Sequence, residues 1–533
     1  MQSTTVHALE YAVMAVYLVV TFGFALHYGR RRACEGTTGY FLAGRALPWY
    51  LIGLSFYASN MSGASFVGLI GASYSHGLTV FHYEWTAALV LVLFAAFIVP
   101  VFLRNRIATV PQYLELRFDR RTRIVYSLFT LLTLLFIDMS GALYAGAIVM
   151  QTGLPGVDLW TACIVISLLV GAYTIFGGLR AVVITDAIQA LVLISGAAAV
   201  ALYGLYAVGG WGALTARLDA SHLSVFRPPD DEFLPWPGIA GVVILGLYYW
   251  TFNQYFVQRA LGAESLEAGR KGALFAGLLK LPNLALMIVP GMVAFALYPA
   301  LESPDKAFPT LAFELLPVGL RGIVLAAMLA AIMSSLDSAL NAASSLVTLD
   351  LVKPRWPHLS ERRLLGIGRI VTGAFMVTAA LYAPLIASFG SLFEYFQATL
   401  AYLVPPIVVI YLVGLLSRRA SRDSAFWALI IVVPLAILAF LTKEVGGLWA
   451  AAGLPDLHFT YMAVAICAIT LALLCLITAL TGDGGKVDPA VTATRADLRP
   501  ERGARAGTLS DYRVTAALLI AATGVLLAGL AAL

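Results

Sequence analysis

The sequence predicts an all-α protein that crosses a membrane many times. Hydrophobic residues make up 60% of the 533 residues and charged residues only 12%, whereas soluble domains carry about 25% charged residues. The mean hydropathy is +0.87, and apolar runs of about 20 residues, long enough to span a bilayer as a helix, recur along the chain. The net charge of +5 comes from basic residues in short loops, so it does not indicate nucleic acid as a partner.

About fourteen apolar runs are long enough to span a bilayer. They lie roughly at residues 8–28, 47–75, 79–103, 125–152, 157–176, 180–208, 236–261, 268–300, 319–352, 365–388, 390–417, 424–442, 457–481 and 511–532. No coiled coil or nucleotide-binding motif interrupts this pattern. We therefore expect a multi-pass protein of the inner or plasma membrane, with the lipid bilayer as its surroundings.

Basic residues occur in every second loop and predict the orientation of the chain. One basic group, assigned to the loop after the seventh run, consists of Arg259, Arg270 and Lys271. The intervening loops are short or mixed, and the loop at 219–236 contains a cluster of acidic residues. Because basic loops stay on the cytoplasmic side, we expect both termini outside the cytoplasm.

Two of the apolar runs are interrupted near their middle. Small and polar residues from Ala58 to Ser65 interrupt the second run, and Gly246 with the cluster Tyr248, Tyr249 and Trp250 interrupts the seventh. Broken helices in corresponding places of two halves are typical of transporters built from inverted repeats. The break frees backbone carbonyls to bind an ion and turns helix ends toward a substrate.

The ninth run becomes small and polar on one face. Ala331, Ser334, Ser335 and Ser338 follow the i, i+3, i+4, i+7 spacing of a helix face, and Asp337 lies at its edge. Hard oxygen ligands suit a hard cation, whereas the alternative is a small-residue stripe for close helix packing. An aspartate at membrane depth costs roughly 2.5–3.5 kcal/mol, which favours a functional site.

A few further ionisable residues lie inside the apolar runs. They are Glu84, Asp138, Asp186 and Lys280. Such groups usually face the bundle interior or a watery cavity and are paired. Internal ion pairs, or for Glu84 a simple charge at a helix start, are the structural alternatives.

Six segments occur in an order that matches a known family. They read NMSGASFVGL followed by HYEW, YTIFGGLRAVVITDAIQ, YYWTFNQYFVQRALGAES, AAIMSSLDSALNAASSLVTLD and FEYFQATLAYLVPPI. Over about residues 40–480, the chain resembles the solute:sodium symporter family, and the last segment resembles its sodium/glucose and sodium/galactose branch. The resemblance implies alternating access powered by the sodium gradient.

The resemblance also implies a leucine-transporter-like core of two inverted five-helix repeats, flanked by extra helices. We expect an N-terminal extra helix and cytoplasmic loop at 1–46, the first repeat at 47–208, the second at 209–417, and C-terminal extra helices at 418–533. The polar segment around 481–511 is expected to be a flexible cytoplasmic linker.

The resemblance places a sodium site between the second and ninth runs. Backbone carbonyls would come from Ala58, Met61 and Ala331, and hydroxyls from Ser334 and Ser335, with Asp186 beside them. No organic cofactor is expected.

Some family members bind a second sodium ion, and the matching positions are Asp337 and Ser338. A carboxylate at Asp337 departs from the hydroxyl that those members use. Two neighbouring carboxylates favour either a second cation or a retained proton, and we prefer the second cation.

The solute pocket implied by the resemblance contains Glu84, Lys280 and Gln397, which offer hydrogen-bond acceptors and donors to sugar hydroxyls. Tyr249 would stack on the sugar ring and form the inner gate, with Asn60 holding its hydroxyl. Tyr83, Leu69 and Phe393 would form the outer gate.

The pocket edges depart from the best-known sugar carriers. Ser65, Ala87 and Gly246 replace residues that are usually larger or polar, so the identity of the sugar is not implied.

We therefore expect a sodium-coupled symporter, not an enzyme. It would import a small neutral polyol, with a monosaccharide as the leading candidate. The alternatives are an amino acid or carboxylate as the solute, or a sensor that uses the transporter fold. A carboxylate solute would need a cation such as Lys280, and Glu84 beside it argues against that. Sensors of this kind often carry a fused signalling domain, and we expect none here.

Overall fold

The structure, a computed structural model, describes residues 7–30, 36–154, 156–388, 391–482, 487–499, 508 and 511–531. The α-helices are α1 (Ala8–Arg30), α2 (Gly36–Leu42), α3 (Trp49–Asn60), α4 (Ile70–His76), α5 (His82–Leu93), α6 (Val99–Arg104), α7 (Val110–Arg117), α8 (Arg120–Thr133), α9 (Ser140–Gly153), α10 (Leu159–Val208), α11 (Trp211–Thr215), α12 (Ala220–Leu223), α13 (Ile239–Thr251), α14 (Gln254–Leu261), α15 (Leu266–Lys280), α16 (Val289–Leu297), α17 (Ala307–Thr310), α18 (Leu320–Ser345), α19 (Lys353–Arg355), α20 (Glu361–Tyr382), α21 (Leu392–Leu403), α22 (Pro405–Leu416), α23 (Arg422–Phe440), α24 (Leu448–Ala451), α25 (Phe459–Thr481) and α26 (Tyr512–Ala531).

Shorter helical turns join many of these helices. The π-helical turns are η2 (Ser65–Leu69), η4 (Phe94–Ile98), η5 (Leu134–Met139), η7 (Leu284–Ile288), η9 (Leu311–Leu315), η10 (Leu346–Val352) and η12 (Leu441–Val445). The 3₁₀ turns are η1 (Ala43–Arg45), η3 (Gly77–Phe81), η6 (Trp236–Gly238), η8 (Pro304–Lys306), η11 (Ala383–Ser388), η13 (Pro489–Val491) and η14 (Arg495–Leu498). The described chain contains isolated β-bridges but no strand, which confirms the all-α prediction.

Eight helices of the described chain are long and apolar enough to cross a membrane, or ten if two bent helix pairs each count as one span. The expected number of about fourteen is therefore not confirmed. One reason is that expected spans are divided into shorter helices; the second consists of α3, η2 and α4. Another is that α10 contributes one full-length span, Leu179–Val208, and a shorter apolar stretch, Leu159–Gly171, within the described residues.

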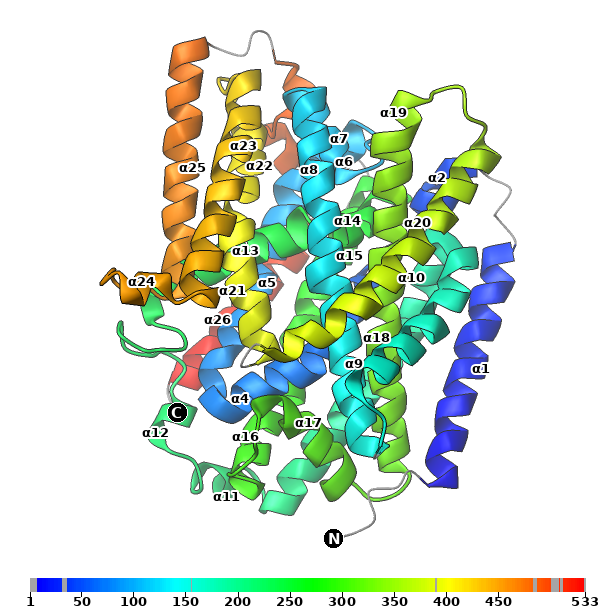
Figure 1. The fold of residues 1–533 in the computed structure, drawn as a ribbon, viewed down its shortest axis with the longest axis vertical. Coiled ribbons are helices and arrows are strands. Elements are labelled where there is room, and N and C mark those ends of the chain that lie inside the picture. Colours follow the sequence, from blue (N-terminus) through cyan, green and yellow to red (C-terminus); the bar gives the residue numbers. More distant parts are fainter. Residues whose placement is uncertain are drawn as a thin grey trace.

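The helices form one bundle with two distinct ends. Figure 1 shows α7 and α19 at one end and α11 and α12 at the other. Inside the bundle α18 packs against α10 through small residues: a Cβ atom on Gly196 would come within 2.4 Å of the Ala327 Cβ. Small residues allow this close approach of helices in a membrane protein.

The predicted break in the second run is confirmed. Helix α3 ends at Asn60, and Met61 leaves the helical region with φ −75° and ψ 65°. The Ser62 hydroxyl accepts a hydrogen bond from the Ser65 amide at 3.1 Å, and the Ser65 hydroxyl donates to the Asn60 carbonyl at 2.7 Å. The small polar residues thus satisfy backbone groups that a helix would otherwise pair.

The seventh run is also broken, but the predicted position of the break was wrong. Helix α13 continues through Gly246 and the aromatic cluster to Thr251, and the chain leaves the helix at Phe252 and Asn253. The Asn253 side chain accepts a hydrogen bond from the Tyr255 amide at 3.3 Å and so begins α14. An asparagine that caps a new helix competes with helix continuation more effectively than aromatic residues do.

The structure differs from the expected flexible linker at residues 487–499. Asp497 forms an ion pair with Arg104 at 2.6 Å, and the Tyr113 hydroxyl donates to the Val491 carbonyl at 3.1 Å. These contacts hold the segment against α6 and α7. Much of the remaining linker lies outside the described residues.

Gly77 provides a test of the fold at the end of the bundle that carries α12. Its φ of +68° and ψ of −140° suit glycine alone, and an added Cβ would lie 2.1 Å from the His222 carbonyl oxygen. We predict that Gly77→Ala lowers the midpoint of thermal unfolding in detergent, because such strain costs about 1–3 kcal/mol even before the clash. Gly212→Ala is the control, since its Cβ would meet nothing within 4 Å; equal midpoints for the two variants would contradict the described packing.

Candidate functional site

A cavity lies where the break after α3 meets α5, α13 and α21. Its volume is about 110 Å³, which is smaller than the roughly 300–1,000 Å³ of pockets that hold drug-sized ligands. The lining residues are Asn60, Ser62, Ala64, Ser65, Leu69, Tyr83, Glu84, Thr86, Val242, Leu245, Gly246, Tyr249, Trp250, Leu392, Phe393, Phe396, Gln397 and Leu400. The structure therefore brings together all the predicted solute and gate residues except Lys280.

Lys280 lies behind the cavity wall. It is the last residue of α15 and is 1% exposed. Its Nζ is 2.5 Å from Glu84 Oε2, and it also donates to Asn60 Oδ1. Because a buried charge needs a close partner, Lys280 holds two lining residues in place.

Asn283 is part of this network and was missed in the sequence. It lies in the bend of 42° between the helical segments Leu266–Lys280 and Leu284–Leu297. Its Nδ2 donates to Glu84 Oε2 at 2.5 Å, and its Oδ1 accepts from the Tyr57 hydroxyl at 3.1 Å. The available signal was an amide directly after a proline within an apolar run, which is weaker than a charge.

Aromatic rings cover one end of the cavity. Tyr83 and Phe393, two predicted outer-gate residues, meet edge to face with ring centroids 4.9 Å apart. Phe233, which was not predicted, packs 6.0 Å from Phe393, and the His76 ring stacks on Phe233 at 3.8 Å. The loop before α13 thus contributes a ring to the gate cluster.

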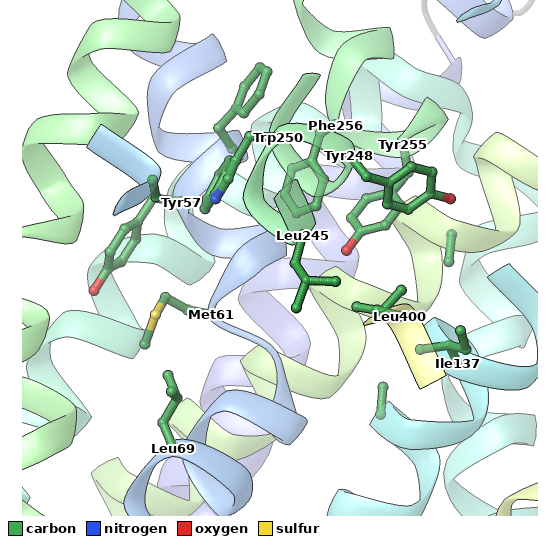
Figure 2. Packing of buried hydrophobic residues seen from close by; sticks show 14 of the residues in the cluster. Tyr57, Met61, Leu69, Ile137, Leu245, Tyr248, Trp250, Tyr255, Phe256 and Leu400 are labelled. Atoms are coloured by element: carbon green, nitrogen blue, oxygen red, sulfur yellow. The ribbon is translucent and has the colours of Figure 1, made fainter. Parts of the chain in front are cut away.

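A second aromatic cluster lies at the other end, around Tyr249. Figure 2 shows Trp250, Phe256 and Tyr255 on one side of Leu245, with Leu69 on the opposite side. The Tyr255 hydroxyl donates to the Tyr249 hydroxyl at 2.8 Å. It is also 3.3 Å from Asp138 Oδ1, which places that half-buried carboxylate beside the predicted inner gate.

The predicted sodium ligands on α3 and α18 lie on facing segments. The Ser335 hydroxyl donates to the Ala331 carbonyl at 2.9 Å and is 3.5 Å from the Ser59 carbonyl. The Ser334 hydroxyl donates to Asp186 Oδ1 at 2.5 Å. Ala58 and Met61, at the end of α3, are fully buried. This set of carbonyl, hydroxyl and carboxylate oxygens fits a hard cation such as sodium.

Arg259 was assigned to a loop, and that assignment was wrong. It lies on α14 with 1% of its surface exposed, and its guanidinium is 3.0 Å from Asp186 Oδ2. The hydroxyls of Ser55 and Ser59 complete the surroundings of that carboxylate, at 2.5 and 3.4 Å. A basic residue near the end of an apolar run resembles a loop residue unless its buried partner is known.

Arg259 also changes the predicted second sodium site. Its guanidinium donates to the Ser338 hydroxyl, which in turn donates to Asp337 Oδ1 at 3.2 Å. A cation at Asp337 and Ser338 would therefore lie beside a fixed positive charge, which weakens its binding.

Known proteins match most of this chain. A sequence model of the sodium:solute symporter family matches residues 40–432. The sodium/glucose cotransporter 4 of Danio rerio is 32% identical over 90% of this chain and 79% of its own length. The sodium/myo-inositol cotransporter 2 of Oryctolagus cuniculus is 33% identical over 89% and 77%, and the sodium/glucose cotransporter of Vibrio parahaemolyticus 32% identical over 80% and 84%.

Solved structures show the same fold. A substrate-bound, outward-open sodium-coupled sialic acid symporter aligns with 90% of this chain and 99% of its own, with a TM-score of 0.76 and 22% identity. The nucleobase-cation symporter Mhp1 in a closed conformation aligns with 86% and 96%, with a TM-score of 0.55 and 15% identity. These similarities confirm the leucine-transporter-like fold.

Ser335 tests the sodium site. We predict that Ser335→Ala raises the sodium concentration needed for half-maximal uptake, because it removes a proposed oxygen ligand while leaving the helix intact. Ser345→Ala is the matched control, since Ser345 is buried on the same helix and also donates back to a carbonyl, that of Ala342, at 2.8 Å. The same sodium dependence in both variants and the wild type would exclude Ser335 as a ligand.

Proposed function

This chain belongs to the sodium:solute symporter family. We propose that it imports a small neutral polyol by sodium-coupled alternating access, with a monosaccharide as the leading candidate. Relatives named as sodium/glucose and sodium/myo-inositol cotransporters support this class of solute. The family consists of transporters rather than enzymes.

The observation that carries the proposal is the neutralised charge of the cavity wall. Glu84 lines the cavity, and the charge of Lys280 is paired with it from behind. A carboxylate or amino-acid solute would need a cation that can form its own charge-assisted hydrogen bonds. The remaining polar side chains, Asn60, Ser65 and Gln397, offer donors and acceptors that suit hydroxyl groups.

The arrangement of the gates supports alternating access. The Tyr83–Phe393 contact covers one end of the cavity and the Tyr249 cluster the other. We propose that the two ends open in turn, and that the Tyr249 ring packs against the solute. The sodium ion would bind between the end of α3 and α18, so that it stabilises the broken helix whose residues also line the cavity.

The proposal includes the organisation of the chain. The repeats are assigned to 47–208 and 209–417, with an extra helix and loop at 1–46 and extra helices at 418–533. Both termini are assigned to the outside, which makes the face with α11 and α12 the outer one. These assignments follow from the loop charges and from the family resemblance.

Uptake into proteoliposomes tests the function directly. We predict that an inward sodium gradient drives accumulation of at least one of radiolabelled D-glucose, D-galactose and myo-inositol, and that a potassium gradient does not. The sodium gradient supplies the driving force only if sodium and the polyol both bind before the cavity opens to the other side of the membrane. Sodium-driven uptake of proline or lactate with none of the polyols would overturn the assigned solute class.

Gln397 tests the cavity. We predict that Gln397→Ala reduces uptake of the accepted polyol to background, because the amide is a direct donor and acceptor for its hydroxyls. Gln151→Ala is the control, since that half-buried glutamine lies on α9 and donates to the Val157 carbonyl at 3.4 Å, away from the cavity lining. Normal uptake by Gln397→Ala would exclude this residue from the solute site.

A further inference from the structure

Asn283 contacts the solute cavity and the proposed sodium site at the same time. Its Nδ2 is 2.5 Å from Glu84 Oε2, which belongs to a residue that lines the cavity. The same nitrogen is 3.1 Å from the sulfur of Met61, whose carbonyl is a proposed sodium ligand. Asn283 itself is fully buried.

The orientation of the amide is determined by its neighbours. A carboxylate accepts hydrogen bonds and does not donate them, so the NH₂ group of Asn283 must face Glu84. Its oxygen then faces the Tyr57 hydroxyl, which donates to it at 3.1 Å. Figure 2 shows Tyr57 and Met61 on the same side of the region, where α3 ends.

The contacts also orient the Glu84 carboxylate. Lys280 and Asn283 both bind Oε2, and within the described residues Oε1 makes no hydrogen bond to the protein. Oε1 is therefore the atom that would accept a hydrogen bond from a solute hydroxyl.

We propose that Asn283 is a positioning residue that couples solute binding to sodium binding, by fixing Glu84 and the broken end of α3 to one amide. This inference rests on the proposed function and adds to it the residue through which the two sites communicate. When a solute binds Glu84, the carboxylate and the amide adjust together, and Met61 is held in the position that its carbonyl needs for sodium. Sodium bound at Met61 orders the amide and presents Glu84 to the solute.

Such coupling must be reciprocal. If sodium raises the affinity for the solute by a given factor, the solute raises the affinity for sodium by the same factor. A residue that merely supports the fold would change the stability of the protein, or it would change the affinity for the solute equally with and without sodium. A coupling residue changes the factor by which sodium raises the affinity for the solute. This factor is therefore the readout that separates the two roles.

The test is an equilibrium titration of the purified full-length protein with D-glucose, D-galactose and myo-inositol, each in sodium and in choline. For the wild type we expect sodium to increase the affinity for the accepted sugar at least about fivefold, a typical allosteric factor. For Asn283→Leu, which keeps the volume and removes the amide, we expect a factor below about two. Sodium titrations with and without the sugar should give the same factors.

Two further variants complete the test. Gln189→Leu removes another fully buried amide, which donates to the Tyr17 hydroxyl at 3.2 Å, and should keep the wild-type factor. Tyr57→Phe removes only the hydroxyl that orients Asn283 and should give an intermediate factor.

A wild-type factor in Asn283→Leu would overturn the proposal. If that variant does not fold, a wild-type factor in Tyr57→Phe would overturn it instead. A wild-type protein that binds none of the three polyols in sodium would overturn the proposed function, and the inference with it, so the two failures are distinguishable.

Discussion

Two buried ion pairs determine how the core of this transporter is assembled. Glu84 on α5 pairs with Lys280 on α15, and Asp186 on α10 pairs with Arg259 on α14. Removing one partner of a buried pair costs about 3–5 kcal/mol because the other charge remains without compensation. Each pair joins a helix of the proposed first repeat, 47–208, to one of the proposed second repeat, 209–417. The packing of the two proposed repeats is therefore fixed at the places where the proposed solute and sodium sites lie.

The broken helix α3 connects these two pairs. Ser55 and Ser59 bind Asp186 before the break, and Asn60 accepts a hydrogen bond from Lys280 at its end. A shift of the broken end would disturb both pairs at once. The proposed sodium ligands and the cavity wall thus share one short segment of backbone, which gives a physical basis for coupling between the ion and the solute.

The sequence predicted the break in α3, because small polar residues within an apolar run carry a strong local signal. The fold class followed from the apolar runs, and the family resemblance supplied half of the residues that line the cavity. It misplaced Arg259, whose partner Asp186 is 73 residues away, since burial of a charge depends on contacts that local pattern does not encode. It missed Phe233, which reaches the cavity region from an irregular loop. The number of spans was not confirmed because bent and divided helices do not follow the length of an apolar run.

Coupling between the proposed solute and sodium sites is tested most directly by measuring sodium movement that is driven by a sugar gradient. Proteoliposomes with equal sodium inside and outside receive an inward gradient of the accepted sugar, and ²²Na⁺ is followed. The account predicts that the sugar gradient drives net accumulation of ²²Na⁺ against its own gradient and that choline-loaded controls without sugar show none. A sugar flux that leaves ²²Na⁺ at equilibrium would contradict the account.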